Sequence, residues 1–196
     1  MSLRKSTQAT INKPVVTTVH QGDCHVSAMQ NVTFSTVLGS CIAACVRDTQ
    51  AKVGGMNHFL LAEQSGSAKD RFGASARYGA YAMEELINMV LKKGTGLKQN
   101  LEIKVFGGGK INSALNDVGA SNIVFVHKFL SDEGYKIASE DMGGNFARRV
   151  LFSPTSGRAR VKRLDSETGQ NIVSKEIAFA GKQKIAKPAD DDIELF

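Results

Sequence analysis

Short runs of residues that favour strands dominate the first third of the chain, and they predict strands. Residues favoured in strands gather in Val15–Val19, Cys24–Ala28 and Val32–Leu38, which are separated by segments that contain Gly or Asn. Two further runs, Cys41–Val46 and Val53–Leu61, flank a polar turn. Their composition predicts a hairpin of mostly buried strands.

The first spacing typical of a helix follows a loop rich in Gly, Ser and charged residues, Glu63–Gly73. Apolar residues then recur every three or four positions until Gly94 ends the pattern: Tyr78, Tyr81, Ala82, Leu86, Met89 and Val90. A second helix is predicted from an N-cap at Ser121 to Gly134. Its apolar side would carry Ile123, Val124, Val126, His127 and Leu130.

Further strands are predicted around the second helix. Leu101–Phe106 precedes it, Tyr135–Ala138 and Arg148–Phe152 follow it, and a basic strand lies at residues 158–163. This order predicts an α+β fold, a layered single domain with a mixed or antiparallel β-sheet and two packed helices.

The length of 196 residues suits one domain with tails. Residues 1–12 are expected to form a flexible N-terminal segment, residues 13–180 the domain, and residues 181–196 a polar C-terminal tail. No apolar run approaches the ~20 residues that span a bilayer, and three cysteines are too few for a disulfide framework. We therefore expect a reduced, cytoplasmic protein with no segment inserted in a membrane.

The net charge of +6 suggests nucleic acid as a candidate partner, but the distribution of the charged residues along the chain argues against such binding. Arg158, Arg160 and Lys162 alternate with Ala159 and Val161, as on a strand with one solvated face. The chain has no Trp, and no aromatic residues alternate with these charges to stack on bases. We predict no nucleic-acid partner, and keep a nucleic-acid binder as the weakest alternative.

The predicted hairpin brings a thiol toward an imidazole. If Thr49 and Gln50 centre the turn, Cys41 stands directly opposite His58, and their side chains share one face. A free thiol has a pKa of ~8.5, and a neighbouring imidazole can take its proton and leave a nucleophilic thiolate. Such a base needs a third group to orient it, and Ser35 or Thr36 on the preceding strand could supply a hydroxyl.

Other residues give weaker signals. Cys45 is expected to be a small core residue, because free cysteines are among the most buried residue types. His20, Cys24 and His25 lack a fourth metal ligand at a sensible spacing, so a zinc site is not predicted. The run Gly107–Gly109 follows a strand but matches neither a dinucleotide fingerprint nor a phosphate loop.

Several segments of the sequence, taken together and in their order along the chain, match the pattern of a known family. The longest are Leu38–Asp48 and Lys52–Leu61, which contain the candidate cysteine and histidine. The others are Arg77–Gly79, Lys104–Gly108, Val118–Asn122, Ser139–Asn145 and Arg148–Arg149. Over about residues 14 to 165, the chain thereby resembles the CheD family of chemoreceptor glutamine deamidases.

The resemblance implies hydrolysis of selected glutamine side chains to glutamate on the cytoplasmic helices of methyl-accepting chemotaxis receptors. It implies Cys41 as the nucleophile of a thioester mechanism and His58 as the base, with no metal or organic cofactor. It also implies a fold similar to that of the cytotoxic necrotising factor-type deamidases and association with CheC-type phosphatases. The alternative is a non-catalytic adaptor of the same fold that binds chemoreceptors or such a phosphatase.

The third residue of the family's site is a threonine six positions before the cysteine, where this chain has Ser35. Thr36 keeps the residue type, but on a regular strand it would face the other way. The spacing therefore favours Ser35, with Thr36 as the alternative. Five further residues are expected to shape turns around the cleft: Gly107, Gly108, Asp141, Gly143 and Gly144.

Overall fold

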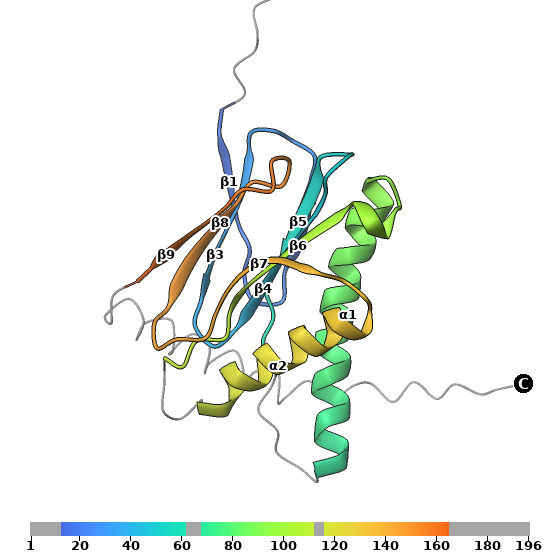
Figure 1. Ribbon diagram of the computed structural model, residues 1–196. Coiled ribbons are helices and arrows are strands. Elements are labelled where there is room, and N and C mark those ends of the chain that lie inside the picture. The colour runs from blue at the N-terminus through green and yellow to red at the C-terminus, as the bar shows by residue number, and fades with distance from the viewer. Residues whose placement is uncertain (1–12, 62–67, 112–115, 165–196) are drawn as a thin grey trace, which may run out of the picture.

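Two β-sheets pack face to face, and two helices cover the outer side of one of them (Figure 1). The computed structural model describes residues 13–61, 68–111 and 116–164. The arrangement confirms an α+β domain with mixed sheets and two helices. The predicted segment 1–12 and everything after residue 164, including the tail 181–196, lie outside the described residues. The predicted domain boundaries therefore stay predictions.

The first sheet has the strand order β1-β3-β8-β9. Its strands are β1 (Val15–Thr18), β3 (Val32–Leu38), β8 (Arg148–Phe152) and β9 (Ala159–Arg163). β1 runs parallel to β3, and the other neighbouring strands are antiparallel. The strand boundaries at β3 and β8 are those that the sequence predicts.

The second sheet has the strand order β2-β5-β4-β6-β7. Its strands are β2 (Cys24–Ser27), β5 (Val53–Asn57), β4 (Ile42–Asp48), β6 (Leu101–Gly107) and β7 (Ile137–Met142). β6 and β7 are parallel, and the remaining pairs are antiparallel. The predicted hairpin is therefore present as β4 and β5 in the middle of this sheet.

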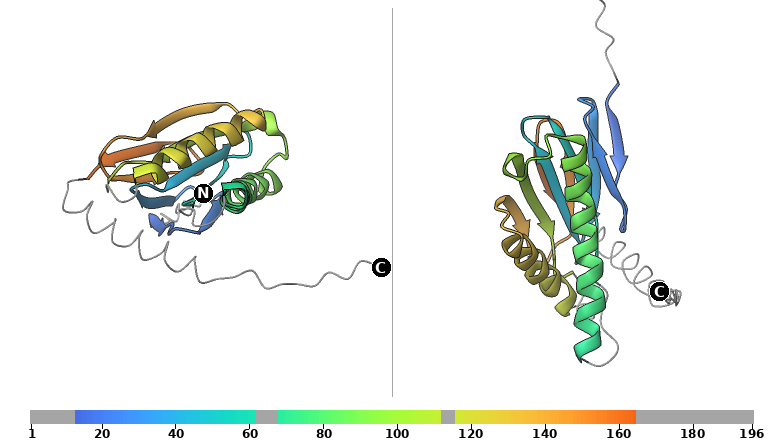
Figure 2. Two further views of the ribbon diagram at one scale, coloured as in Figure 1. Left: turned by 90° about the horizontal axis from the view of Figure 1, so that it is seen from below. Right: turned by 90° about the vertical axis from the view of Figure 1, so that its right-hand side faces the viewer.

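The helices α1 (Ala68–Lys93) and α2 (Asn116–Asp132) lie on the side of the second sheet that faces away from the first sheet (Figure 2). A short 3₁₀ helix, Lys98–Asn100, leads from α1 into β6. Within the described ranges, no helix has both the length and the apolar character needed to cross a membrane.

The central strand β4 of the second sheet is buried on both faces, which explains its nearly continuous apolar sequence. In β4 and the residue before it, Cys41, Ala43 and Cys45 contribute to the core between the two sheets. The alternate residues of β4 pack toward the helices: Ile42, Ala44 and Val46. The first sheet closes the inner core with side chains of β3 and β8: Phe34, Leu38, Val150 and Phe152.

Both helices begin earlier than the sequence predicts. α1 starts at Ala68, inside the predicted loop Glu63–Gly73, and α2 starts at Asn116, before the expected N-cap at Ser121. Ser121 is instead an exposed residue in the second turn of α2, where a polar side chain costs little. Three residues assigned to apolar faces are exposed: Tyr81, Val124 and His127. The buried faces are Met83, Leu86, Ile87 and Val90 of α1 and Val118, Asn122, Val126 and Leu130 of α2.

The turn between β4 and β5 lies one residue further along the chain than predicted. Asp48 pairs with Val53, so the turn is centred between Gln50 and Ala51. Oδ1 of Asp48 accepts hydrogen bonds from the backbone N–H groups of Gln50 (3.0 Å) and Ala51 (2.9 Å). These hydrogen bonds to a buried carboxylate set the position of the turn. The polar composition of the segment alone does not reveal that position.

Asp48 also joins this turn to the segment after α1. Its Oδ2 accepts hydrogen bonds from the backbone N–H (2.7 Å) and the hydroxyl (2.5 Å) of Thr95. Burial raises the pKa of Asp48, but the hydrogen bonds from Thr95, Ala51 and Gln50 outweigh it and hold that pKa below its ordinary value. The ionised carboxylate is therefore the form that the fold stabilises.

Replacing this carboxylate should destabilise the protein at neutral pH. We expect Asp48→Asn to lower the free energy of unfolding by about 1–3 kcal/mol, because the NH2 group that replaces one carboxylate oxygen cannot accept the hydrogen bonds which that oxygen receives. A lowered pKa stabilises the fold above the unfolded pKa of about 3.9 and ceases to do so as the pH falls through the folded value. The difference between wild type and variant should therefore shrink in acid, as measured by urea unfolding between pH 7 and 3.

The matched control is Asp132→Asn, which removes an exposed carboxylate that pairs with Lys128 on the surface of α2. Its effect should stay below about 0.5 kcal/mol at every pH. An Asp48→Asn protein as stable as wild type at pH 7 would contradict the assignment.

Candidate active site

The segment before β4 is held by hydrogen bonds to three successive carbonyl groups. Gly39 O accepts from Gly109 N (2.7 Å), and Cys41 O accepts from Gly108 N (2.8 Å). Ser40 O accepts from the side-chain amide of Asn122, at 2.8 Å from Nδ2. The peptide planes on both sides of the cysteine are therefore fixed. We call Gly39–Cys41 the nucleophile turn below.

The approach of Gly107 to this turn requires glycine. Gly107 has φ 118°, and a Cβ atom there would lie 2.0 Å from the carbonyl oxygen of Cys41. Both the positive φ and the contact exclude a side chain. Gly107 and Gly108 thus shape the nucleophile turn, as the sequence led us to expect.

His58 lies just beyond the C-terminal end of β5. Ile42 and Phe59 form a pair in which each N–H bonds to the other's carbonyl at 2.9 Å. In this register Leu60, not His58, is opposite Cys41, so the predicted pairing was wrong by two residues. The cause is the turn position set by Asp48. Because side chains alternate with a period of two, His58 still shares a face with Cys41, as a diagonal neighbour.

The pairing of β4 with β5 is interrupted beside His58. Oδ1 of Asn57 accepts the hydrogen bond from Ala44 N at 2.9 Å, in place of a backbone carbonyl. Nδ2 of Asn57 donates to Ala82 O of α1 at 2.8 Å. A buried asparagine therefore ends β5 and anchors the residue before His58 to a helix.

The imidazole of His58 is held by Thr36. Oγ1 of Thr36 lies 2.8 Å from Nδ1 of His58 and donates its own proton to Val19 O at 2.7 Å. Val19 O is also 3.4 Å from Nδ1. A hydroxyl has one proton to donate and a carbonyl has none, so Nδ1 must be the donor toward both oxygens. The neutral ring then carries its proton on Nδ1, and Nε2 is the basic nitrogen.

Ser35 does not share this position. Along β3 the odd-numbered residues are partly exposed and the even-numbered ones buried, and Thr36 is 1% exposed. The side chain of Ser35 therefore points to the opposite face of the first sheet. Its backbone carbonyl accepts a hydrogen bond from Val19 N (2.8 Å). The contact geometry favours Thr36 over Ser35, the residue that the spacing favours, and the choice between them stays a prediction.

The other two cysteines are poor nucleophiles. Cys45 is 1% exposed in the core between the sheets, and burial raises the pKa of its thiol, outweighing an opposite effect of Lys104. Burial, aided by Glu85, raises the pKa of Cys24 to about 12. Both stay as thiols at neutral pH, which leaves Cys41 as the candidate nucleophile.

Comparison with known proteins assigns the family. The family described as CheD chemotactic sensory transduction matches residues 60–163. A protein of Caulobacter vibrioides named "Probable chemoreceptor glutamine deamidase CheD" is 55% identical over 183 residues, 91% of this chain and 91% of that protein. The chain belongs to the CheD family.

Relatives from other bacteria carry the same name. The CheD 1 protein of Ruegeria is 49% identical to this chain and covers 91% of it, over 94% of its own length. The CheD protein of Hahella chejuensis is 43% identical and covers 89% of this chain, over 82% of its own length.

Three residues that contact Cys41 or hold the segments around Cys41 and His58 are absent from the sequence-based predictions: Gln21, Asn57 and Asn122. Oε1 of Gln21 lies 3.7 Å from Sγ of Cys41. Asn122, on α2, holds the nucleophile turn through Nδ2 and accepts a hydrogen bond from Leu61 N at Oδ1 (2.9 Å). An isolated amide residue gives no signal in a single sequence, because its partners are known only from the fold.

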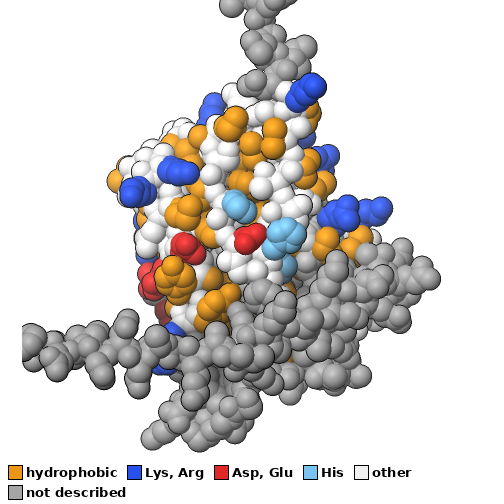
Figure 3. All heavy atoms as spheres, turned by 180° about the vertical axis from the view of Figure 1, so that it is seen from behind, with side chains coloured by type: hydrophobic (Ala, Val, Ile, Leu, Met, Phe, Trp, Pro, Cys, Tyr) orange, Lys and Arg blue, Asp and Glu red, His pale blue; other side chains and the backbone are white. Residues whose placement is uncertain are grey.

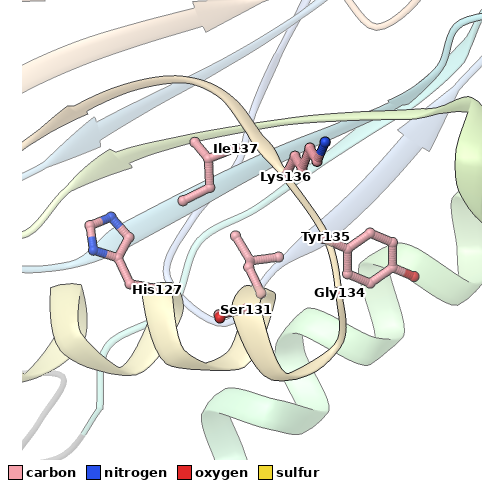
Figure 4. Close-up of a pocket in the computed structure, with 7 residues that line it drawn as sticks. His127, Ser131, Gly134, Tyr135, Lys136 and Ile137 are labelled. Carbon is pink, nitrogen blue, oxygen red and sulfur yellow. The ribbon is translucent and has the colours of Figure 1, made fainter.

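A hollow of about 380 Å³ lies elsewhere, between the C-terminal end of α2 and the start of β7 (Figure 4). His127, Ser131 and Tyr135 are among its lining residues. His127 is an exposed residue that pairs with Glu140 at 2.8 Å, and no cysteine lines the hollow. Within the described ranges, no three His, Cys, Asp or Glu side chains are grouped so that they could hold a metal ion.

The basic strand β9 resembles a solvated strand. Ala159 and Val161 pack on the inner core, and Arg160 and Lys162 are exposed. The guanidinium of Arg163 lies over the ring of Phe146, 4.3 Å from its centroid. On the face seen from behind, Lys and Arg side chains are interspersed with apolar and acidic ones (Figure 3). This distribution favours no nucleic-acid surface on that face.

Gly107→Ala should damage both stability and activity, because it combines backbone strain with a collision at Cys41 O. We expect a loss of at least about 3 kcal/mol in the free energy of unfolding, measured by denaturant titration. Gly134→Ala is the control, since Gly134 also has a positive φ (69°) but nothing lies within 4 Å of a Cβ there. It should lose only about 1 kcal/mol. Equal losses would show that the contact with Cys41 O is unimportant.

Proposed function

We propose that this chain hydrolyses the side-chain amide of selected glutamines on methyl-accepting chemotaxis receptors, producing glutamate and ammonia. Two facts support the proposal: the chain belongs to the CheD family, and its relatives carry the name chemoreceptor glutamine deamidase. The observation that carries it is the Thr36–His58 contact of 2.8 Å, on the sheet face that His58 shares with Cys41.

In the proposed mechanism, Nε2 of His58 takes the proton of the Cys41 thiol. The thiolate attacks the carboxamide carbon, and the carbonyl electron pair moves to oxygen. When the intermediate collapses, the C–N bond breaks and His58 returns the proton to the leaving ammonia. Water then attacks the thioester with His58 as base, the C–S bond breaks, and glutamate is released.

Thr36 acts as a positioning residue in this scheme. By accepting a hydrogen bond from Nδ1–H it keeps Nε2 free to act as the base, and it would stabilise the imidazolium that forms when Nε2 is protonated. Threonine is suited to this role because its β-branched side chain has few rotamers. The scheme requires no metal or organic cofactor.

The same proposal covers partners and setting. An acidic receptor helix bundle would attract a chain with a net charge of +6, mainly by raising the association rate. Association with a CheC-type phosphatase, a cytoplasmic location and a fold like that of the cytotoxic necrotising factor-type deamidases belong to the proposal as implications of the family.

Loss of the thiol should abolish the activity. We expect Cys41→Ala to show no deamidation of receptor cytoplasmic fragments, because no other described thiol can replace it. The gain of about one dalton per converted glutamine is measured by peptide mass spectrometry. Cys45→Ala is the matched control and should remain active. An active Cys41→Ala would reject the assignment, and would leave a non-catalytic adaptor if the wild type is also inactive.

Replacing Thr36 and replacing Ser35 should have different effects on the rate of deamidation. We expect Thr36→Val to slow single-turnover deamidation about 10–100-fold, because it keeps the shape but removes the acceptor for Nδ1–H. Ser35→Ala should change the rate less than about threefold, since Ser35 lies on the other face. The opposite order would restore Ser35 as the orienting residue. Wild-type rates in both variants would exclude a hydroxyl-oriented imidazole.

A further inference from the structure

The turn between β1 and β2 is attached to the backbone of His58. His58 N donates to Asp23 O (3.1 Å), and Gly22 N donates to His58 O (2.7 Å). The turn itself is closed by a hydrogen bond from Asp23 N to His20 O (2.9 Å) and one from His20 N to Oδ2 of Asp23 (2.9 Å). Gln21 lies inside this turn, between His20 and Gly22, and its backbone is therefore fixed relative to His58, the candidate base.

Gln21 directs its side-chain amide at the nucleophile. Oε1 lies 3.7 Å from Sγ of Cys41. Nε2 of the same amide is buried and has no hydrogen-bond partner among the residues that the structure describes. A buried donor without an acceptor costs about 1–3 kcal/mol, so its position next to a reactive sulfur calls for a function.

We infer that Gln21 donates a hydrogen bond from its side-chain amide to the oxyanion formed when Cys41 attacks a substrate carbonyl. This inference rests on the proposed deamidation. The oxyanion is bonded to the carbon that has just joined Sγ, so it develops within a short distance of the sulfur. A useful donor lies 2.7–3.1 Å from that oxygen, which a group already in contact with Sγ can reach.

The amide serves two successive states. Beside the thiol, Oε1 accepts the S–H hydrogen bond seen here. Once His58 has taken the proton, the sulfur no longer has a proton to donate. Rotation about the terminal torsion of the side chain, which has a broad energy well, then turns Nε2 toward the developing negative charge. No additional reactant is needed, because the donor only stabilises charge.

Gln21→Ala tests the inference by removing the donor without disturbing the backbone hydrogen bonds of the turn. We expect kcat for deamidation of a receptor cytoplasmic fragment to fall about 10²–10³-fold, with KM changed less than about threefold. Gln21→Glu, which replaces the donor by a carboxylate of the same shape, should fall at least as far. Gln50→Ala, which removes an exposed amide at the β4–β5 turn, should match wild type.

Two further readouts separate this role from a structural one. The midpoint of thermal unfolding of Gln21→Ala should be unchanged or higher, since a buried unpartnered donor is removed. Alkylation of Cys41 by iodoacetamide should not accelerate. A kcat within about threefold of wild type would overturn the inference. So would faster alkylation together with faster turnover, because Gln21 would then only cover the sulfur. An inactive wild type would instead overturn the proposed function.

Discussion

The nucleophile turn depends on three carbonyl groups held at once, and much of the fold serves those three bonds. Gly108 and Gly109 come from the end of β6, and Asn122 comes from α2. A turn between strands of two different sheets would otherwise sample several conformations. With its peptide planes fixed from two directions, the turn presents the sulfur of Cys41 in one place.

The support extends through a buried arginine. Arg148 on β8 is fully buried and donates to Asp141 and to the carbonyl of Gly143. Gly143 N bonds to Gly107 O at 2.8 Å, so the loop held by Arg148 is bonded to the glycines that hold the nucleophile turn. Burial lowers the pKa of Arg148, while Asp141 opposes that shift. A charge of this kind is stable in the interior only when it is paired and hydrogen-bonded, as it is here.

Local patterns were sufficient to predict most strands, and they single out Cys41 and His58 as candidate site residues, which stays a prediction. Local patterns failed where the structure of a segment depends on a residue far away in the sequence. The register of β4 and β5 depends on Asp48, whose partners include Thr95 after α1. The helix starts were missed because residues 68–73 and 116–120 mix Gly and charged or polar residues with few apolar ones, a composition that loops share. Amide residues such as Asn122 become recognisable only through the groups that the fold brings to them.

The positions of Ser35 and Thr36 show why spacing along the chain is a weak guide to the candidate site. Thr36 lies in β3 of the first sheet, whereas Cys41 directly precedes β4 and His58 directly follows β5 of the second sheet, and the inner faces of the two sheets pack on each other. Counting alternate residues back from Cys41 crosses from one sheet to the other at the nucleophile turn, so the parity of positions has no meaning there. The residue that can face His58 is instead set by the inner face of β3, on which Thr36 lies with Phe34 and Leu38. The hydroxyl of Thr36 therefore reaches the imidazole of His58 only when the two sheets pack, so the geometry of the candidate site depends on the formation of the core.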